Sequence, residues 1–141
     1  MSSDCLFCKI IRGEVSSYKI YEDEEIFAFF DIMPCSRGHT LIVPKEHSAT
    51  FSDMRSQDAA NLFKVVNKIT KHLKTNLSAD GFSIGINNGK AAGQTVMHTH
   101  VHIIPRMKND DGGSLHDIIQ SDVDTSEDSM KELVELIKMT D

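Results

Sequence analysis

The chain has 141 residues, with 15 Lys or Arg and 21 Asp or Glu, so its formal net charge is −6. This length is typical of a single domain over residues 1–141 that buries its own core. The acidic balance argues against a broad nucleic-acid surface, although it allows binding of one nucleotide. The longest mainly apolar run, Ile26 to Met33, contains Asp31 and is far shorter than the ~20 residues of a membrane helix, so we expect no membrane span.

The N-terminus and the cysteine count favour the cytoplasm. The first residues, MSSDC, lack a basic region followed by an apolar one, so they do not resemble a secretory signal. Three cysteines are an odd number, which suits reduced thiols better than a secreted disulfide framework.

Sequence patterns in the first part of the chain predict a short helix followed by three strands. The helix covers residues 5–11 and ends near a glycine. Runs rich in β-branched and aromatic residues predict strands at 18–21 and 25–31, joined as a hairpin, and at 39–43, where Pro44 stops the strand.

In the second part of the chain the spacing of apolar residues changes from that of strands to that of a helix. Apolar residues every 3.6 positions predict a long amphipathic helix over 57–76. An alternating strand follows at about 82–87, and the next strand runs over 95–104 until Pro105. A capping pattern at Thr125–Asp128 predicts a terminal helix. Because the strands occur in runs, we expect an α+β fold with an antiparallel sheet.

Residues 98–102 read His-Thr-His-Val-His. In a strand, alternate residues share a face, so His98, His100 and His102 would line one side of the sheet. Three crowded imidazoles bring no packing benefit, which indicates either a metal site or histidine catalysis on a phosphate or acyl group.

The neighbouring loop, residues 88–95, favours histidine catalysis on a phosphate group over the other options. It reads NGKAAGQT, and Asn87 precedes it on the polar face of a predicted strand. Small residues and backbone N–H groups in such a loop can hold an anion, although an ordinary turn would have the same composition. Neutral imidazole is a nucleophile that can attack phosphorus and form a phosphoramidate, which water later cleaves.

Cys5-x-x-Cys8 has the spacing of a zinc half-site and, less well, of a redox pair. A four-ligand site would have to recruit histidines, and the candidates are His47 and one end of the histidine strand. The spacing alone leaves zinc binding undecided.

Together these segments resemble the histidine-triad (HIT) family, whose pattern is His-φ-His-φ-His-φ-φ with φ apolar. The match centres on GQTVMHTHVHIIPR at 93–106, with CLFCKIIRGE at 5–14, FFDI at 29–32 and GHTLIVPKEH at 38–47 in the family's order. The chain looks closest to the Hint-like branch with the C-x-x-C start. Thr99 departs from the pattern by filling an apolar position.

The resemblance implies a HIT-like fold with five antiparallel strands, one long helix and short terminal helices. It also implies a homodimer with a ten-stranded sheet, and chemistry at the α-phosphate of a nucleotide. The part that bears the motifs covers about residues 5–106, and residues 107–141 form an unmatched extension.

The same resemblance assigns roles to individual residues. His100 would become nucleotidylated, while His102 and Asn87 would contact phosphate oxygens. The remaining expected substrate and catalytic positions are Gly93, Gln94 and Thr95 near the phosphate or leaving group, His39 as support, Asp31 at the ribose, and Leu6, Phe7, Ile10, Phe29 and Ile32 around the base. The implied ligands of a structural zinc ion are Cys5, Cys8, His47 and His98, and no organic cofactor is expected.

These features predict a hydrolase that cleaves purine nucleoside 5′-phosphoramidates of the AMP–amine type. One alternative is a dinucleoside polyphosphate hydrolase of the same superfamily. Another, of a different class, is an AMP-binding regulatory or scaffold protein with incidental catalysis. A purely structural zinc module is the least favoured, because it leaves His100 and His102 without a role.

Overall fold

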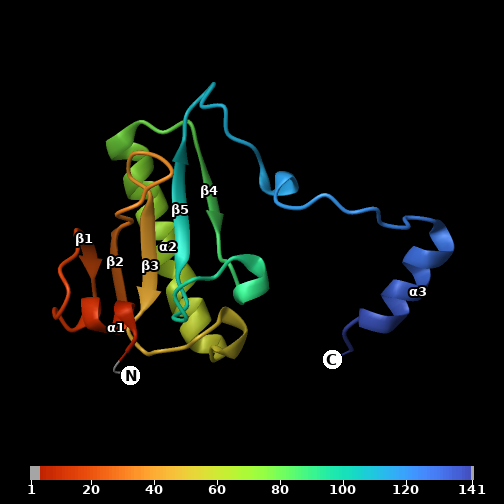
Figure 1. Cartoon of the computed structure of the whole chain (residues 1–141), viewed down its shortest axis with the longest axis horizontal. Coiled ribbons are helices and arrows are strands. Elements are labelled where there is room, and N and C mark those ends of the chain that lie inside the picture. The colour runs from red at the N-terminus through yellow and green to blue at the C-terminus, as the bar shows by residue number, and fades with distance from the viewer. Residues whose placement is uncertain (1–3, 141) are drawn as a thin grey trace.

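A computed structural model describes residues 4–140 of the chain as an antiparallel sheet between helices (Figure 1). The five strands lie in the order β1-β2-β3-β5-β4, so the predicted α+β class and strand count are confirmed. The elements in chain order are α1 (Leu6–Ile11), β1 (Lys19–Glu22), β2 (Ile26–Phe30), β3 (Thr40–Pro44), η1 (Phe51–Asp53), α2 (Ser56–Leu77), β4 (Gly81–Gly85), η2 (Lys90–Ala92), β5 (Val101–Arg106), η3 (Leu115–Asp117) and α3 (Glu127–Ile137).

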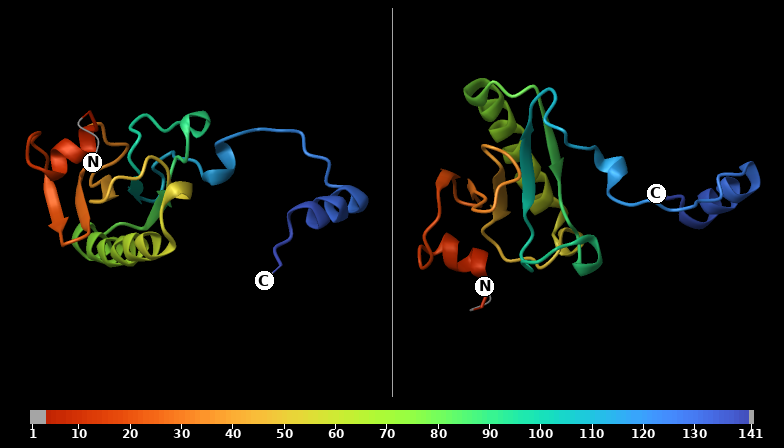
Figure 2. Two further views of the ribbon diagram at one scale, coloured as in Figure 1. Left: turned by 90° about the horizontal axis from the view of Figure 1, so that it is seen from below. Right: turned by 45° about the horizontal axis from the view of Figure 1, so that its top comes forward.

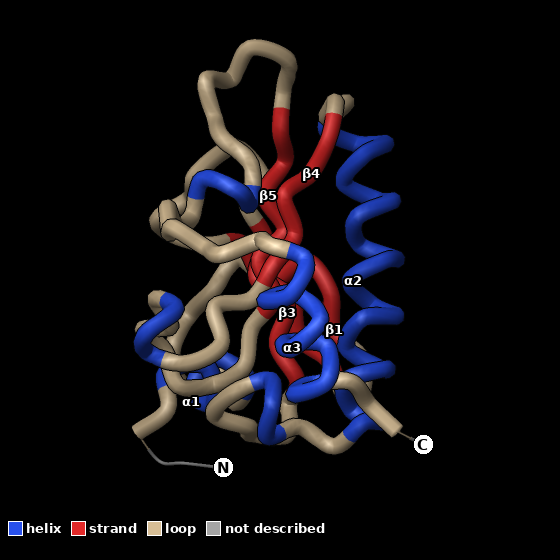
Figure 3. The backbone as a smooth tube through the Cα atoms, turned by 90° about the vertical axis from the view of Figure 1, so that its right-hand side faces the viewer, coloured by secondary structure: helices blue, strands red, loops and turns tan. Residues whose placement is uncertain are grey.

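The long helix α2 covers one face of the sheet, and the short helix α1 lies on the other face (Figures 2 and 3). The apolar stripe of α2 packs on alternate strand residues such as Ile42, Val101 and Ile103, each 0% exposed. Burial of this stripe is what holds an amphipathic helix against a sheet.

The face under α1 has its own apolar cluster, made of the alternate residues of the same strands. Phe7 and Ile10 from α1 pack against Phe29, Leu41 and Val43. Because Val101 and Ile103 point to α2, the period of two directs His100 and His102 to the α1 face. The sheet thus separates an apolar core from a face that carries histidines.

Gly38 allows the chain to pass close to α2 just before His39. Its φ is +91°, and a Cβ at this position would lie 2.4 Å from Leu77 Cδ1. A larger residue would meet both backbone strain and a clash here, so glycine is needed to bring β3 into place.

The last predicted strand was wrong at both ends. It begins at Val101 instead of Thr95, because the chain bends at 96–98 and the Thr99 N–H donates to Ser48 O at 2.7 Å, outside the ladder. It also continues through Pro105, which pairs with Phe82. Proline is tolerated there because β3 pairs with β5 only as far as Ile103, so the side of Pro105 that lacks an N–H needs no strand partner. β3, by contrast, ends at Pro44, one residue beyond the predicted strand, as expected of a proline that stops a strand.

Residues 107–140 form a C-terminal arm that leads away from the sheet (Figure 1). No residue of the arm is buried, and its helix α3 has Leu133, Val134 and Ile137 at 44–65% exposure. Among the described residues, no helix is long and apolar enough to cross a membrane.

Candidate active site and metal centre

Two cysteines and two histidines converge at one end of the sheet. The ligand atoms of Cys5, Cys8, His47 and His98 all lie within 4.8 Å of one another. Cys5 caps α1, Cys8 lies in its first turn, His47 follows β3, and His98 precedes β5. Chain segments more than 90 residues apart thus bring together the four predicted zinc ligands.

The donor chemistry of this cluster fits a metal ion. Nδ1 of His98 lies 3.2 Å from Cys5 Sγ, 3.5 Å from Cys8 Sγ and 3.1 Å from His47 Nδ1. Its other nitrogen, Nε2, donates to Pro44 O at 2.7 Å, so Nδ1 of the neutral ring presents a lone pair. Burial lowers the His98 pKa to about 4, which keeps the ring neutral at pH 7. Two thiols and two imidazoles with converging lone pairs are a zinc-type donor set.

The middle histidine of the triad is held in one tautomer. His100 is 6% exposed, and its Nδ1 lies 2.8 Å from the carbonyl oxygen of His98. Because a carbonyl can only accept, Nδ1 carries the proton and Nε2 of the neutral ring carries the lone pair. Burial lowers the His100 pKa, which keeps this lone pair free near neutral pH. This is the state that a nucleophilic imidazole requires.

A chain of hydrogen bonds sets the opposite tautomer at His102. The backbone N–H of Cys35 donates to His39 Nδ1 at 3.0 Å, so the proton of neutral His39 lies on Nε2. His39 Nε2 in turn lies 2.9 Å from His102 Nδ1, which must therefore accept. The proton of His102 is thus on Nε2, the one buried side-chain nitrogen or oxygen in the described chain without a hydrogen-bond partner. An unused buried donor of this kind suits an incoming phosphate oxygen.

Burial keeps this histidine pair neutral. It lowers the His102 pKa to about 4, assisted by the neighbouring His100 and His39, and it also lowers the His39 pKa. The Asp31 carboxylate, 3.6 Å from His39 Nε2, acts in the opposite direction. Asp31 also accepts the Met33 N–H at 2.9 Å, and its side chain is 19% exposed, so its second oxygen faces His39 at the edge of the site.

The expected base-binding residues fall into a buried and an exposed group. Phe7 is 5% exposed and meets His100 edge-on, with ring centroids 5.0 Å apart. Ile10 and Phe29 are buried beside it in the apolar cluster under α1. Leu6 is 44% exposed and Ile32 is 78% exposed. The first three therefore support the site from within, and the other two offer surface to a ligand.

The residues expected near the phosphate also include both exposed and buried side chains. Asn87 and Thr95 are exposed, and the Asn87 side chain lies beside Gly93. Gln94, by contrast, is 5% exposed, and its amide is fully engaged: Nε2 donates to Ala49 O and Val96 O, and Oε1 accepts from Gly89 N. In this structure its amide binds the protein's own backbone.

A cavity of about 370 Å³ opens beside His39 and His102. Asp31 and Asn87 line it, as do Leu115 and Ile118 from the C-terminal arm. Sequence reasoning missed these two arm residues, as it missed the backbone groups of Pro44 and Cys35 that orient two of the histidines. No side-chain pattern marks a backbone carbonyl or amide as functional, so these contacts needed the tertiary structure.

Comparison with known proteins agrees with this arrangement. The sequence model of the HIT domain family matches residues 12–109. An uncharacterized HIT-like protein of Methanocaldococcus jannaschii is 49% identical over 106 residues, covering 75% of this chain and 81% of its own. The adenylylsulfatase HINT3 of Arabidopsis thaliana is 42% identical over 78% of this chain and 56% of its own. The adenosine 5′-monophosphoramidase HNT1 of Candida albicans is 38% identical over 74% and 71%.

Solved structures show the same fold. A Streptococcus mutans protein superposes with a TM-score of 0.86 at 42% identity, covering 96% of this chain and 83% of its own. A zinc-bound histidine triad family protein of Mycobacterium smegmatis gives a TM-score of 0.74 at 41% identity, over 77% and 78%. The family match, these identities and the placement of the three histidines lead to one conclusion: the chain belongs to the HIT family.

Proposed function

We propose that this protein is a nucleotide hydrolase that cleaves the bond between the α-phosphate and nitrogen in purine nucleoside 5′-phosphoramidates. The observation that carries the proposal is the pair of opposite tautomers, with a lone pair on His100 Nε2 beside a proton on His102 Nε2. A nucleophile and an oxyanion donor side by side are what phosphoryl transfer needs.

In the proposed reaction His100 Nε2 attacks the α-phosphorus and forms an N–P bond. The P–N bond to the amine breaks, and the amine leaves with its electron pair and takes a proton from water. The His102 Nε2–H donates to a phosphate oxygen as charge develops. Water then attacks the phosphorus of nucleotidyl-His100 and gives a proton to the hydroxide left by the first step, and the N–P bond breaks to release the nucleoside monophosphate and restore the neutral ring.

Nucleotide-directed activities in the names of two relatives support this substrate class. The Candida albicans relative is named as an adenosine 5′-monophosphoramidase and the Arabidopsis thaliana relative as an adenylylsulfatase. Both names describe cleavage next to an adenylyl phosphate. We propose that the exposed Asn87 and Thr95 and the side chain of Asp31 contact the phosphate, the leaving group and the ribose of such a substrate.

The test is turnover of an adenosine 5′-phosphoramidate that carries a fluorogenic amine. We expect His100→Ala to lower kcat by about a thousandfold or more while AMP binding stays measurable by calorimetry. The matched control is His72→Ala, which removes an exposed histidine on α2 and should leave kcat unchanged. Full turnover by His100→Ala would refute the mechanism.

Further substrates separate the competing functions. A higher kcat/KM on a diadenosine polyphosphate or on adenylyl sulfate would keep the histidine mechanism and replace the phosphoramidate as substrate. Tight AMP binding with slow turnover of all three would instead favour a regulatory nucleotide-binding protein.

We also propose that the four-residue cluster holds a structural zinc ion, in a cytoplasmic protein whose thiols stay reduced. Its supports are the converging donor set and the zinc-bound relative of Mycobacterium smegmatis. With four protein ligands, Cys5, Cys8, His47 and His98, zinc would brace α1 against the sheet and leave no open position for chemistry.

Removal of metal with a chelator should therefore lower the Tm by about 10 °C or more, measured by calorimetry. The specific activity of the fraction that remains folded should change much less. Activity that disappears on chelation without unfolding would show that the metal takes part in the reaction.

We further propose a homodimer built on β4. Within the described chain the sheet has two open edges, the outer edges of β1 and β4. The pairing of β1 is irregular between Lys19 and Tyr21, a feature that disfavours further pairing, whereas β4 pairs regularly with β5. Open edges are sites of strand pairing, and an antiparallel second copy would extend the sheet to ten strands.

A further inference from the structure

His47 is the one proposed zinc ligand that lies neither on α1 nor next to β5. It belongs to the segment 45–50, which has no helix or strand of its own. A ligand on such a segment keeps its place only if the segment is tied to the rest of the site. Two buried side chains make those ties, and they come from the residues just before β5.

The first is Thr99, which is 1% exposed. Both its N–H, at 2.7 Å, and its Oγ1, at 3.0 Å, donate to the carbonyl oxygen of Ser48. Ser48 directly follows His47, while Thr99 lies between His98 and His100. One carbonyl therefore joins the His47 segment to the triad. This bond also accounts for a hydroxyl residue at a position where the family pattern has an apolar one.

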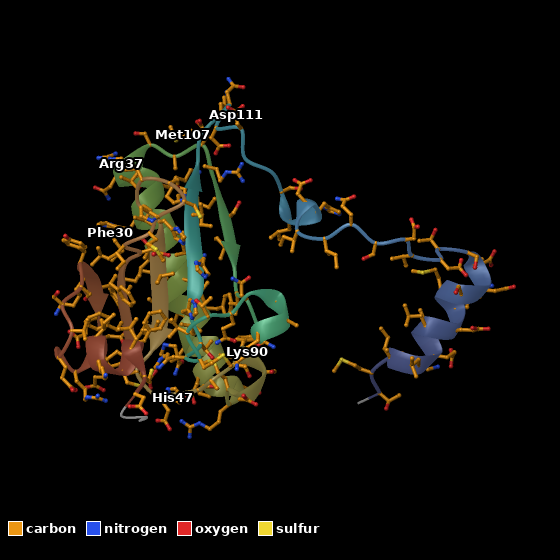
Figure 4. All side chains as sticks on the ribbon, viewed as in Figure 1. Phe30, Arg37, His47, Lys90, Met107 and Asp111 are labelled. Atoms are coloured by element: carbon orange, nitrogen blue, oxygen red, sulfur yellow. The ribbon has the colours of Figure 1, made fainter. Side chains whose placement is uncertain are left out.

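The second is Gln94, whose Nε2 donates to Ala49 O at 2.6 Å and to Val96 O at 3.0 Å. Its Oε1 accepts the Gly89 N–H at 2.8 Å. Gly89 precedes η2, and the labelled Lys90 of η2 lies at the same end of the sheet as His47 (Figure 4). Gln94 thus ties the His47 segment to the loop beside the candidate phosphate site.

Buried polar side chains with every bond satisfied rigidify a site, and they are costly to leave half-paired. We propose that Thr99 and Gln94 are positioning residues that form a latch, fastening the His47 segment to the triad segment. The latch keeps His47 Nδ1 facing His98 Nδ1 at the metal centre. It also holds the His98–Thr99 backbone, whose carbonyl sets the tautomer of His100. The inference rests on the proposed function and on its zinc site.

The test compares three substitutions of buried or half-buried threonines. Thr99→Val keeps the shape and the backbone N–H bond but removes the hydroxyl, and Thr99→Ser keeps the hydroxyl. The matched control is Thr70→Val, which also removes a hydroxyl that donates to a backbone carbonyl, Val66 O at 2.8 Å, but on α2 away from the site.

Three quantities are measured on each purified protein. They are the rate at which zinc passes to a chromophoric chelator, the Tm with and without zinc, and kcat and KM on the phosphoramidate. The rise in Tm on zinc loading separates a hydroxyl that positions the zinc ligands from one that only stabilises the fold. A hydroxyl of the second kind stabilises metal-free and zinc-loaded protein equally, so its loss leaves the rise unchanged.

We expect Thr99→Val to release zinc about tenfold faster, in line with the loss of groups that orient metal ligands. Its rise in Tm on zinc loading should shrink, and its kcat should fall several-fold with little change in KM, because the nucleophile is displaced and the binding surface is not. Thr99→Ser should restore all three. Thr70→Val should lower both Tm values equally and leave zinc release unchanged.

Gln94→Glu provides a second variant, since it replaces the Nε2 donor with an acceptor facing two carbonyls. It should also release zinc faster than wild type. Unchanged zinc release and an unchanged rise in Tm in both Thr99→Val and Gln94→Glu would overturn the latch. Wild type that binds no zinc would overturn both the zinc site and the latch. If wild type binds zinc and the variants release it faster as expected, but no protein, wild type included, turns over the phosphoramidate, the proposed hydrolase would be overturned and the latch would remain supported.

Discussion

The sheet and the C-terminal arm differ in whether their apolar side chains are buried. In the sheet, Ile103 is 0% exposed, and the histidines on the neighbouring positions are held by named partners. In the arm, Leu133 and Val134 follow an equally clear helical pattern and are 44% and 54% exposed. The family match ends at residue 109, close to where burial ends.

The difference shows that a local pattern and a packed position are separate properties. α3 has a Ser126 cap and an amphipathic sequence, and both are local. A helix of this length is marginally stable by itself, so its apolar face gains from a partner surface that the described chain does not supply. The triad histidines, in contrast, are buried or half-buried and hydrogen-bonded, His98 to Pro44 O and His102 to His39 from another segment, and His100 to the His98 carbonyl.

The largest difference in stability between the two regions should come from matched truncations of one apolar side chain in each. Ile103→Ala removes a buried side chain under α2 and should lower the free energy of unfolding by about 2–5 kcal/mol. Leu133→Ala removes a side chain that is 44% exposed in the arm and should cost less than about 0.5 kcal/mol. Urea denaturation followed by circular dichroism measures both.

The same experiment tests what the arm contacts. If Leu133→Ala cost more than about 1 kcal/mol, and more at higher protein concentration, the arm would be packed on a second copy of the chain. The contrast between the two regions would then hold for one chain and not for the assembly.

A change of pH should have a smaller effect on the stability of the protein. The His102 pKa is lowered from 6.5 in the unfolded chain to about 4, so between these values the unfolded state binds more protons. Stability should therefore rise with pH across this window, with about 1 kcal/mol lost at pH 5.5 through His102. Through His102 alone, kcat/KM should fall only well below pH 6.5, because protonated His102 can no longer accept from His39.

Stopped-flow assays and urea titrations at several pH values check both parts. The matched variant is His116→Ala, which removes an exposed histidine of the arm and should leave both profiles unchanged. A kcat/KM that already halves near pH 6.5 would mean that the triad histidines are not desolvated as the structure shows.

Much of the site could be predicted from the sequence because its chemistry belongs to particular side chains. The C-x-x-C spacing and the alternation of His98, His100 and His102 each pointed to a cluster before any fold was known. The extent of β5 was mispredicted, because β propensity at Thr95 and Thr99 was overridden by a bond to Ser48 and proline was assumed to end the strand. Gln94 was expected near the phosphate or the leaving group, and its sequence position did not show that its amide also binds backbone.

The sequence by itself determined the order of the elements, the period of each one and the residue types that carry chemistry. The tertiary structure decided which nitrogen of each imidazole carries the proton, because His98 O, Pro44 O and the Cys35 N–H reach these rings from backbone positions that any residue type would offer. It also decided that Thr99 and Gln94 turn inward while the arm stays exposed. Burial and tautomer depend on what lies opposite a side chain in space, and that neighbour is often far away in the sequence.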